Sequence, residues 1–149
     1  MALSLVRQKS DMDCGIAALA MVHGVEYSDV VGAFPHACHF RGVHVAEMIV
    51  GLERMGACPW HVHKPQPYKP LAELVEKLSS IAGPALLIVR KASDKFGHWV
   101  AYEGGVIYDP EHQRPRAIGS YGRRGWNLIR VLTPTPMVGK SARSKARAS

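Results

Sequence analysis

The hydrophobic pattern of this chain changes partway along its length, and that change constrains the fold more than any other feature. Up to about residue 80, apolar residues recur at helical spacings, every three or four positions. From residue 85 onwards they stand in short apolar runs typical of buried strands, and two of these runs flank a Gly-Gly pair. Helices in the first half and antiparallel strands in the second predict an α+β domain.

The same pattern predicts where these elements begin and end. Gly24 and Gly56 are suited to end helices, Ser28 to cap one, and Pro70 to take a first helical position. Helices are expected at residues 14–24, 28–34, 43–56 and 70–80. Strands are expected at residues 85–89, 99–102, 106–108 and 128–132.

Length and composition fit one domain with a tail. The 149 residues are 47% hydrophobic and 21% charged, which excludes wholesale disorder. We expect a domain over residues 1–133 and a basic flexible tail over residues 134–149, because a TPTP segment ends the last apolar run. No apolar run approaches the roughly 20 residues of a membrane span, and the N-terminus does not resemble a secretion signal. With three cysteines in the chain, these features predict a cytoplasmic protein.

Positive charge is concentrated towards the C-terminus. The formal net charge is +7, and residues 111–149 hold nine Lys or Arg against one Asp or Glu. Such an end attracts nucleic acid, an anionic membrane surface or an acidic partner, and the plain alternative is a solvated tail. Nucleic acid or an acidic assembly bound through the tail is therefore a candidate partner.

Cys14 stands at the predicted start of the first helix, directly after Asp13. The free N–H groups of a first helical turn and the helix dipole stabilise negative charge, so a thiol there is favoured as the reactive thiolate. The adjacent Gly15 is expected to leave space for a substrate. The alternative is that Cys14 is simply packed, as free cysteines commonly are.

A thiolate nucleophile needs an imidazole to hold and return its proton, and His98 is the best candidate. If Gly104-Gly105 forms a two-residue hairpin turn, His98 and Asp109 become a diagonal cross-strand pair within hydrogen-bonding reach. Asp109 is therefore the predicted orienting partner of the imidazole. The alternative is a surface histidine and an ordinary turn aspartate.

Gln8 is the candidate donor to the oxyanion of an acyl-transfer intermediate. It lies six residues before Cys14, so its side-chain amide is expected beside the backbone N–H of Cys14. Two such donors stabilise the negative charge that develops on the carbonyl oxygen. Taken as an isolated residue, Gln8 is better explained as a plain surface polar residue.

Three segments resemble the double-glycine leader peptidases, the papain-like cysteine peptidase domains found on bacteriocin-exporting ABC transporters. The segment around the nucleophile is QKSDMDCGIAALAMV, and the second long helix is RGVHVAEMIVGLERMG. The strand pair with the catalytic histidine and a following Asp-Pro is GPALLIVRKASDKFGHWVAYEGGVIYDPEHQ. The resemblance spans roughly residues 5–132. Because no membrane or nucleotide-binding domain accompanies these segments, we expect a stand-alone form of the family.

The resemblance implies a papain-like fold, with an N-terminal helical lobe packed on a C-terminal antiparallel sheet. It implies a cysteine endopeptidase that needs no cofactor or metal and cuts a peptide or protein substrate, in this family after Gly-Gly in a leader or precursor. Cys14 would be the nucleophile, His98 the base, Asp109 its partner and Gln8 the oxyanion donor. Two alternatives remain open. One is another acyl-transfer enzyme, such as an isopeptidase, deamidase or transglutaminase. The other is a non-catalytic peptidase-like binding module attached to nucleic acid or an acidic assembly by its tail.

Two stretches rich in histidine and cysteine have a metal-binding alternative. They lie at residues 36–44 and 58–63, where short spacings are compatible with zinc. The spacing fits no standard zinc motif, so a solvated loop and an edge strand are favoured.

The tryptophans and one pair of arginines are expected to have structural roles. Trp60, Trp99 and Trp126 are expected to pack in the core or cleft rather than to stack on nucleic-acid bases. Arg123 and Arg124 stand between glycines and are expected in an exposed basic loop.

Overall fold

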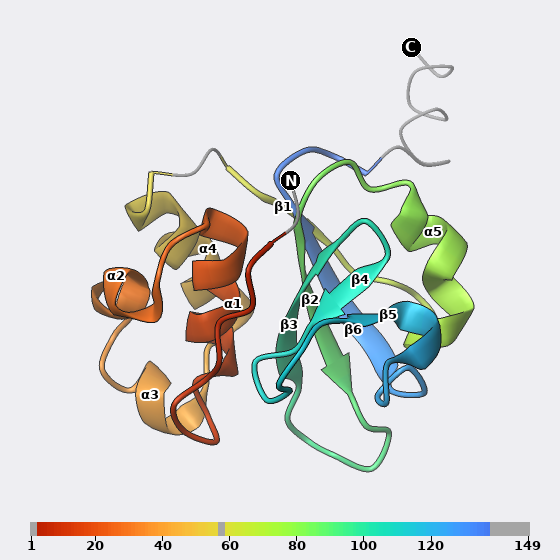
Figure 1. Cartoon of the computed structure of the whole chain (residues 1–149), viewed down its shortest axis with the longest axis horizontal. Helices are drawn as coiled ribbons and strands as arrows, with labels where there is room; N and C mark the ends of the chain where they lie inside the picture. Colours follow the sequence, from red (N-terminus) through yellow and green to blue (C-terminus); the bar gives the residue numbers. More distant parts are fainter. Residues whose placement is uncertain (1–2, 57–58, 138–149) are drawn as a thin grey trace.

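The computed structural model describes residues 3–56 and 59–137 of the chain. A helical lobe formed by the N-terminal part of the chain lies beside a six-stranded antiparallel sheet formed largely by the second half (Figure 1). The predicted α+β class is therefore confirmed. The two lobes correspond to the two kinds of hydrophobic spacing in the sequence.

Two ten-residue helices dominate the helical lobe, and both were expected from the apolar spacing. They are α1 (Cys14–His23) and α4 (Val45–Arg54). Between them lie α2 (Tyr27–Val30), the 3-10 turn Val31–Ala33 and α3 (Cys38–Arg41). No periodicity predicts α3, because a single turn is too short to show one.

Two helix starts differ from the predictions. Glu26, not Ser28, caps α2: Glu26 and Asp29 form a reciprocal capping box, in which the Asp29 carboxylate accepts the backbone N–H of Glu26 at 3.0 Å. The helix predicted at residues 70–80 begins as the 3-10 turn Leu71–Leu74 and continues as α5 (Val75–Ser79).

The sheet has the strand order β1-β6-β2-β3-β4-β5, and every neighbouring pair is antiparallel. The strands are β1 (His61–His63), β2 (Ala85–Arg90), β3 (His98–Glu103), β4 (Val106–Tyr108), β5 (Arg116–Ala117) and β6 (Asn127–Thr133). Four of the strands expected from the sequence are β2, β3, β4 and β6, and the edge strand favoured for residues 58–63 is β1. A 3-10 turn, Ile118–Ser120, follows β5.

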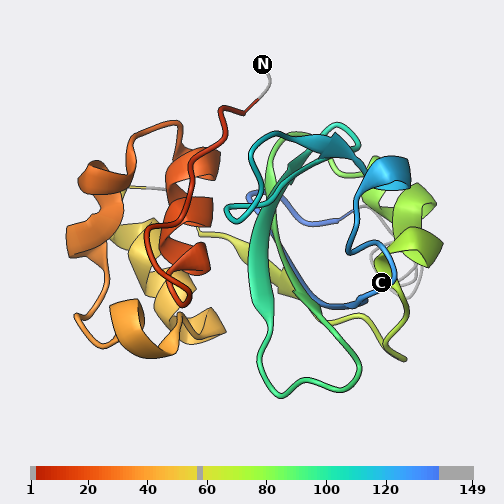
Figure 2. The same ribbon diagram turned by 60° about the horizontal axis from the view of Figure 1, so that its bottom comes forward.

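Two apolar clusters cover the two faces of the sheet. Successive strand residues point to opposite faces, so Leu86 joins the cluster around α1 while Leu87 joins the cluster that contains Leu71 and Leu78. Figure 2 shows α1 on one side of the sheet and α5 on the other. Helix α1 contacts β2 and β3, so its N-terminal end is held against the sheet.

The turn between β3 and β4 fixes the geometry on which the candidate site depends. Gly104 and Gly105 have φ angles of 60° and 83°, a left-handed conformation that glycine adopts without strain. Glu103 pairs with Val106 across this turn, as predicted. The register therefore places His98, the first residue of β3, diagonally opposite Asp109, the residue that follows β4.

The first residues of the predicted tail, up to Met137, are within the described structure, and Met137 contacts the domain. Met137 packs partly buried against the cluster around α5, while residues 138–149, with all the Lys and Arg of the tail, lie outside the described residues. Within residues 3–56 and 59–137, no single helix is long and apolar enough to cross a membrane. Among these described residues, Cys14–His23 and Tyr27–Ala33 together have the length and apolar composition of a span, but the pair is bent by 102°.

Gly15 is required by packing, which corrects the expectation that it leaves space for a substrate. A Cβ atom on Gly15 would lie 2.9 Å from Cβ and Cγ2 of Val43 and 3.0 Å from Cδ1 of Trp99. We expect Gly15→Ala to lower the free energy of unfolding by about 1–3 kcal/mol through overpacking. Urea denaturation measures this, with Gly32→Ala as the matched control, because a Cβ there meets nothing within 4 Å. Equal stabilities of the two variants would contradict the packing argument.

Candidate active site

Cys14 is the first residue of α1 and lies where the helical lobe meets β3. It is 7% exposed. The backbone N–H of Trp99 donates to Sγ of Cys14 at 3.4 Å. This donor and the N-terminal end of α1 both favour negative charge on the sulfur. The predicted place of Cys14 at a helix start is confirmed.

His98 begins β3 and Asp109 directly follows β4. Nε2 of His98 and Oδ1 of Asp109 are 2.7 Å apart, which confirms the diagonal pair predicted from the two-glycine turn. The exposed fractions are 9% and 1%. Because Asp109 engages Nε2, the other ring nitrogen, Nδ1, is the one left for the thiol of Cys14.

The carboxylate of Asp109 is held by further donors on both oxygens. The backbone N–H of Glu111 donates to Oδ1 at 2.9 Å. The hydroxyl of Tyr121 and a guanidinium N–H of Arg123 donate to Oδ2 at 2.7 Å and 2.9 Å. Tyr121 is fully buried, so its hydroxyl is fixed in position. No pattern in the sequence indicates Tyr121 or Arg123 as a partner of Asp109.

These contacts set the protonation state of the pair. Burial by itself would lower the pKa of His98, but the hydrogen bond with the Asp109 carboxylate and the neighbouring sulfur of Cys14 outweigh it and raise the pKa of His98 to about 9. Burial would raise the pKa of Asp109, but the hydrogen bonds from His98 and Tyr121 hold it far below its usual range. At neutral pH the arrangement therefore favours an imidazolium beside a carboxylate and next to the thiol.

Arg123 is a member of the site, which corrects the expectation that it lies in an exposed basic loop; its neighbour Arg124 is exposed. Arg123 NH1 lies 2.7 Å from Oε1 of Glu111, and that oxygen is 3.6 Å from Nε2 of His98. His98, Asp109 and Glu111 offer ligand atoms within 4.8 Å of one another, a spacing that suits a metal ion. The guanidinium already lies against both carboxylates, so an ionic network without a metal accounts for their placement.

Gln8 reaches the site through its backbone. Its N–H donates to the carbonyl of Pro110 at 3.1 Å, so it lies beside the residue that follows Asp109. Its side-chain N–H₂ donates to the carbonyl of Ser10 at 2.6 Å, and its Oε1 is buried without a partner in the described part of the chain. The side-chain amide of Gln8 is therefore bound within its own loop. The position expected from the sequence was beside the backbone N–H of Cys14.

Asp13 organises the loop that precedes α1. Its two carboxylate oxygens accept the backbone N–H groups of Lys9 and Ser10, both at 2.9 Å, and the hydroxyl of Tyr27 at 2.7 Å. Burial would raise the pKa of Asp13, but the Tyr27 hydroxyl and the two N–H groups lower it. Asp13 makes no side-chain cap on α1, so its contribution is to hold the shape of the loop.

Packing of the tryptophans agrees with the structural interpretation. Trp99 is 3% exposed, and its indole N–H donates to the carbonyl of Val43 at 2.8 Å. Trp60 and Trp126 are partly buried against the two apolar clusters. Trp99 therefore ties the strand that carries His98 to the segment preceding α4.

The two stretches rich in histidine and cysteine contribute nothing to the ligand group around His98 within the described residues. Cys38 is buried at the start of α3, and the ring of His36 contacts that of Phe40. His63, on the edge strand β1, has Nε2 3.1 Å from the hydroxyl of Thr133. Cys58 lies outside the described residues.

No protein-family model and no curated protein matches this chain. The candidate site is therefore defined by its own geometry: a cysteine at a helix start, a histidine with a raised pKa and a buried aspartate that orients it.

Proposed function

We propose that this chain is a cysteine peptidase with a papain-like fold. The observation that carries the proposal is the 2.7 Å hydrogen bond between His98 and Asp109, formed next to a cysteine at the start of α1. A helical lobe carrying the cysteine and an antiparallel sheet carrying the histidine and aspartate support the papain-like class.

The proposed hydrolysis starts from a Cys14 thiolate beside the His98 imidazolium. The Cys14 thiolate attacks the carbonyl carbon of the scissile peptide bond, and the carbonyl oxygen takes the negative charge. The His98 imidazolium then protonates the amine as the carbon–nitrogen bond breaks, which leaves a thioester on Cys14. Neutral His98 accepts a proton from water as that water attacks the thioester, and the carbon–sulfur bond then breaks. The acid product leaves, and the Cys14 thiolate stands again beside the His98 imidazolium. Asp109 orients the ring throughout.

The oxyanion needs donors near Cys14. The backbone N–H of Cys14 is one, and the side-chain amide of Gln8 is the second once it turns from Ser10 towards the site. The buried Oε1 of Gln8 has no partner to hold the present orientation in the described part of the chain. Substrate binding is therefore expected to reorient this amide.

Cleavage after a Gly-Gly pair is the preferred specificity. Cys14 is 7% exposed, so the residues that approach its sulfur have little room. Glycine has no side chain to be excluded. The resemblance of three segments to leader peptidases points to the same substrates, and the protein substrate is thus a precursor with a small pair before the scissile bond.

The pH dependence of Cys14 alkylation by iodoacetamide, read by peptide mass spectrometry, tests the proposed ion pair. Because His98 stays protonated up to about pH 9, we expect Cys14 to react well below the reference thiol pKa of about 8.5. The same protein in urea gives the ordinary thiol profile, and His98→Ala should return the folded protein towards that profile. The proposal is wrong if folded Cys14 reacts no faster near neutral pH than it does in urea.

A further inference from the structure

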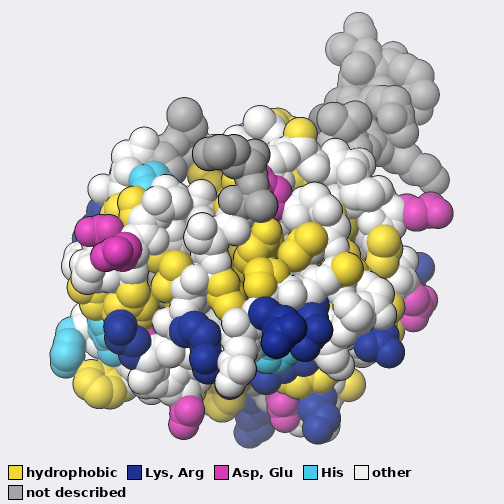
Figure 3. Space-filling view, viewed as in Figure 1, with side chains coloured by type: hydrophobic (Ala, Val, Ile, Leu, Met, Phe, Trp, Pro, Cys, Tyr) yellow, Lys and Arg dark blue, Asp and Glu magenta, His cyan; other side chains and the backbone are white. Residues whose placement is uncertain are grey.

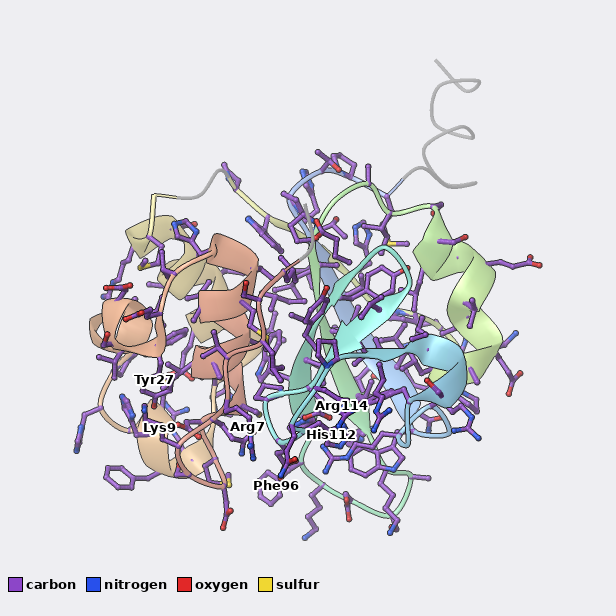
Figure 4. All side chains as sticks on the ribbon, viewed as in Figure 1. Arg7, Lys9, Tyr27, Phe96, His112 and Arg114 are labelled. Carbon is purple, nitrogen blue, oxygen red and sulfur yellow. The ribbon has the colours of Figure 1, made fainter. Side chains whose placement is uncertain are left out.

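Exposed side chains surround the candidate site on the segments that carry its residues. Arg7 and Lys9 flank Gln8. Phe96 precedes His98 in the loop before β3, and Arg114 follows Asp109 in the loop after β4. Figure 4 labels these side chains along the lower part of one face, together with His112.

This face is cationic. Figure 3 shows a row of dark-blue side chains across it, at the places where Figure 4 labels Lys9, Arg7 and Arg114. All three are exposed, and none forms an ion pair with a carboxylate in the described part of the chain. Lys9 lies over the ring of Tyr27, with Nζ 5.2 Å from the ring centroid, which holds its ammonium group at this surface.

Contacts within the molecule join this row to the site. The backbone of Gln8, between the two N-terminal cations, donates to the carbonyl of Pro110. The side chain of His112 lies 3.8 Å from Asp109. The carboxylate of Glu111, the acidic residue on this loop besides Asp109, is occupied by Arg123 at 2.7 Å. Glu111 is therefore already paired and does not neutralise Arg114 on the same loop.

Phe96 adds an apolar group to the same rim. It is 72% exposed, although burial of a phenylalanine is ordinarily favourable. It stands two residues before His98, so an extended chain that enters the site passes close to it. An apolar side chain of the bound peptide would cover the Phe96 ring.

We propose that this rim, formed by Arg7, Lys9, Phe96 and Arg114, docks an acidic segment of the peptide substrate that also carries an apolar side chain. The inference rests on the proposed function, because the occupant of the rim must continue as a polypeptide into the site at Cys14. That continuity favours an acidic peptide over nucleic acid.

Fluorescence anisotropy with the full chain carrying Cys14→Ala tests the docking without turnover. The probe is a fluorescein-labelled peptide with glutamates and one leucine before a Gly-Gly pair, compared with the same peptide carrying glutamine for glutamate. We expect the double variant R7E/R114E to weaken binding of the glutamate peptide about tenfold, and rising salt to do the same. We expect Phe96→Ala to weaken both peptides by a few-fold.

The matched control is Lys77→Glu, a charge reversal at an exposed residue of α5, which lies on the other side of the sheet from α1. It should change binding less than about twofold. Equal binding of the two peptides, or an equal loss with Lys77→Glu, would overturn the proposal. So would an oligonucleotide that binds in an R7E/R114E-sensitive manner while the glutamate peptide does not. Charge-selective binding without hydrolysis by the unmodified chain would instead refute the proposed function and leave the docking surface in place.

Discussion

Replacing Cys14 with alanine is expected to lower the rate of hydrolysis of a Gly-Gly peptide by at least about 1,000-fold, because the substitution removes the atom that attacks the carbonyl carbon. Alanine keeps the start of α1, so the loss should come without a large change in stability; the free energy of unfolding is measured in parallel. The assay is a quenched fluorescent peptide with the products identified by mass.

Cys38→Ala is the matched control for this prediction. Cys38 is also buried at the start of a helix, but its thiol neighbours Glu47 and Arg41, and its pKa is raised by burial and then by the Glu47 carboxylate. That variant should retain hydrolysis close to the unsubstituted chain. If Cys14→Ala retained hydrolysis, the nucleophile would have to be another group. Product masses separate peptide hydrolysis from deamidation, since only hydrolysis splits the peptide.

The pair of His98 and Asp109 was accessible from the sequence because a local rule fixes it. Two consecutive glycines demand a tight turn, the turn fixes the register, and the register brings residues on neighbouring strands into contact. The helix starting at Cys14 was similarly local, since its apolar spacing and the stop at Gly24 lie within one segment. The α+β class followed from the two kinds of spacing.

The missed contacts depend on tertiary packing, which leaves no local pattern. Tyr121 and Arg123 reach Asp109 from a loop between β5 and β6, and that loop has neither period nor motif. Tyr27 likewise reaches Asp13 from the helix after α1. Two arginines between glycines satisfy the description of an exposed basic loop, and only the fold turns Arg123 inwards.

The absence of free space beside Cys14 also depends on tertiary packing. Gly15 next to a reactive cysteine suggests room for a substrate, but the room is taken by Val43 and Trp99 from two other elements. The side-chain orientation of Gln8 was also beyond the sequence, because its carbonyl partner on Ser10 is set by the loop that Asp13 holds.

The second large effect is expected from Asp109→Asn, which removes the charge of the carboxylate and keeps its shape. With the carboxylate charge gone, burial is opposed less strongly at His98, so its pKa should fall from about 9. We expect hydrolysis near neutral pH to fall about 100-fold, because the imidazolium that protonates the leaving amine is lost.

The lower pKa of His98 in Asp109→Asn should change the pH dependence of kcat/KM. In the unsubstituted chain His98 holds its proton up to about pH 9, so kcat/KM should decline only above that pH. In Asp109→Asn the decline should begin at a lower pH, and an NMR titration of the His98 ring should show the same displacement. Glu111→Gln is the matched control: that carboxylate is 3.6 Å from Nε2 and its side chain is 38% exposed, so solvent screens it and its removal should shift the profile far less. Identical pH profiles for Asp109→Asn and the unsubstituted chain would show that Asp109 does not raise the pKa of His98. The role proposed for Asp109 would then be wrong.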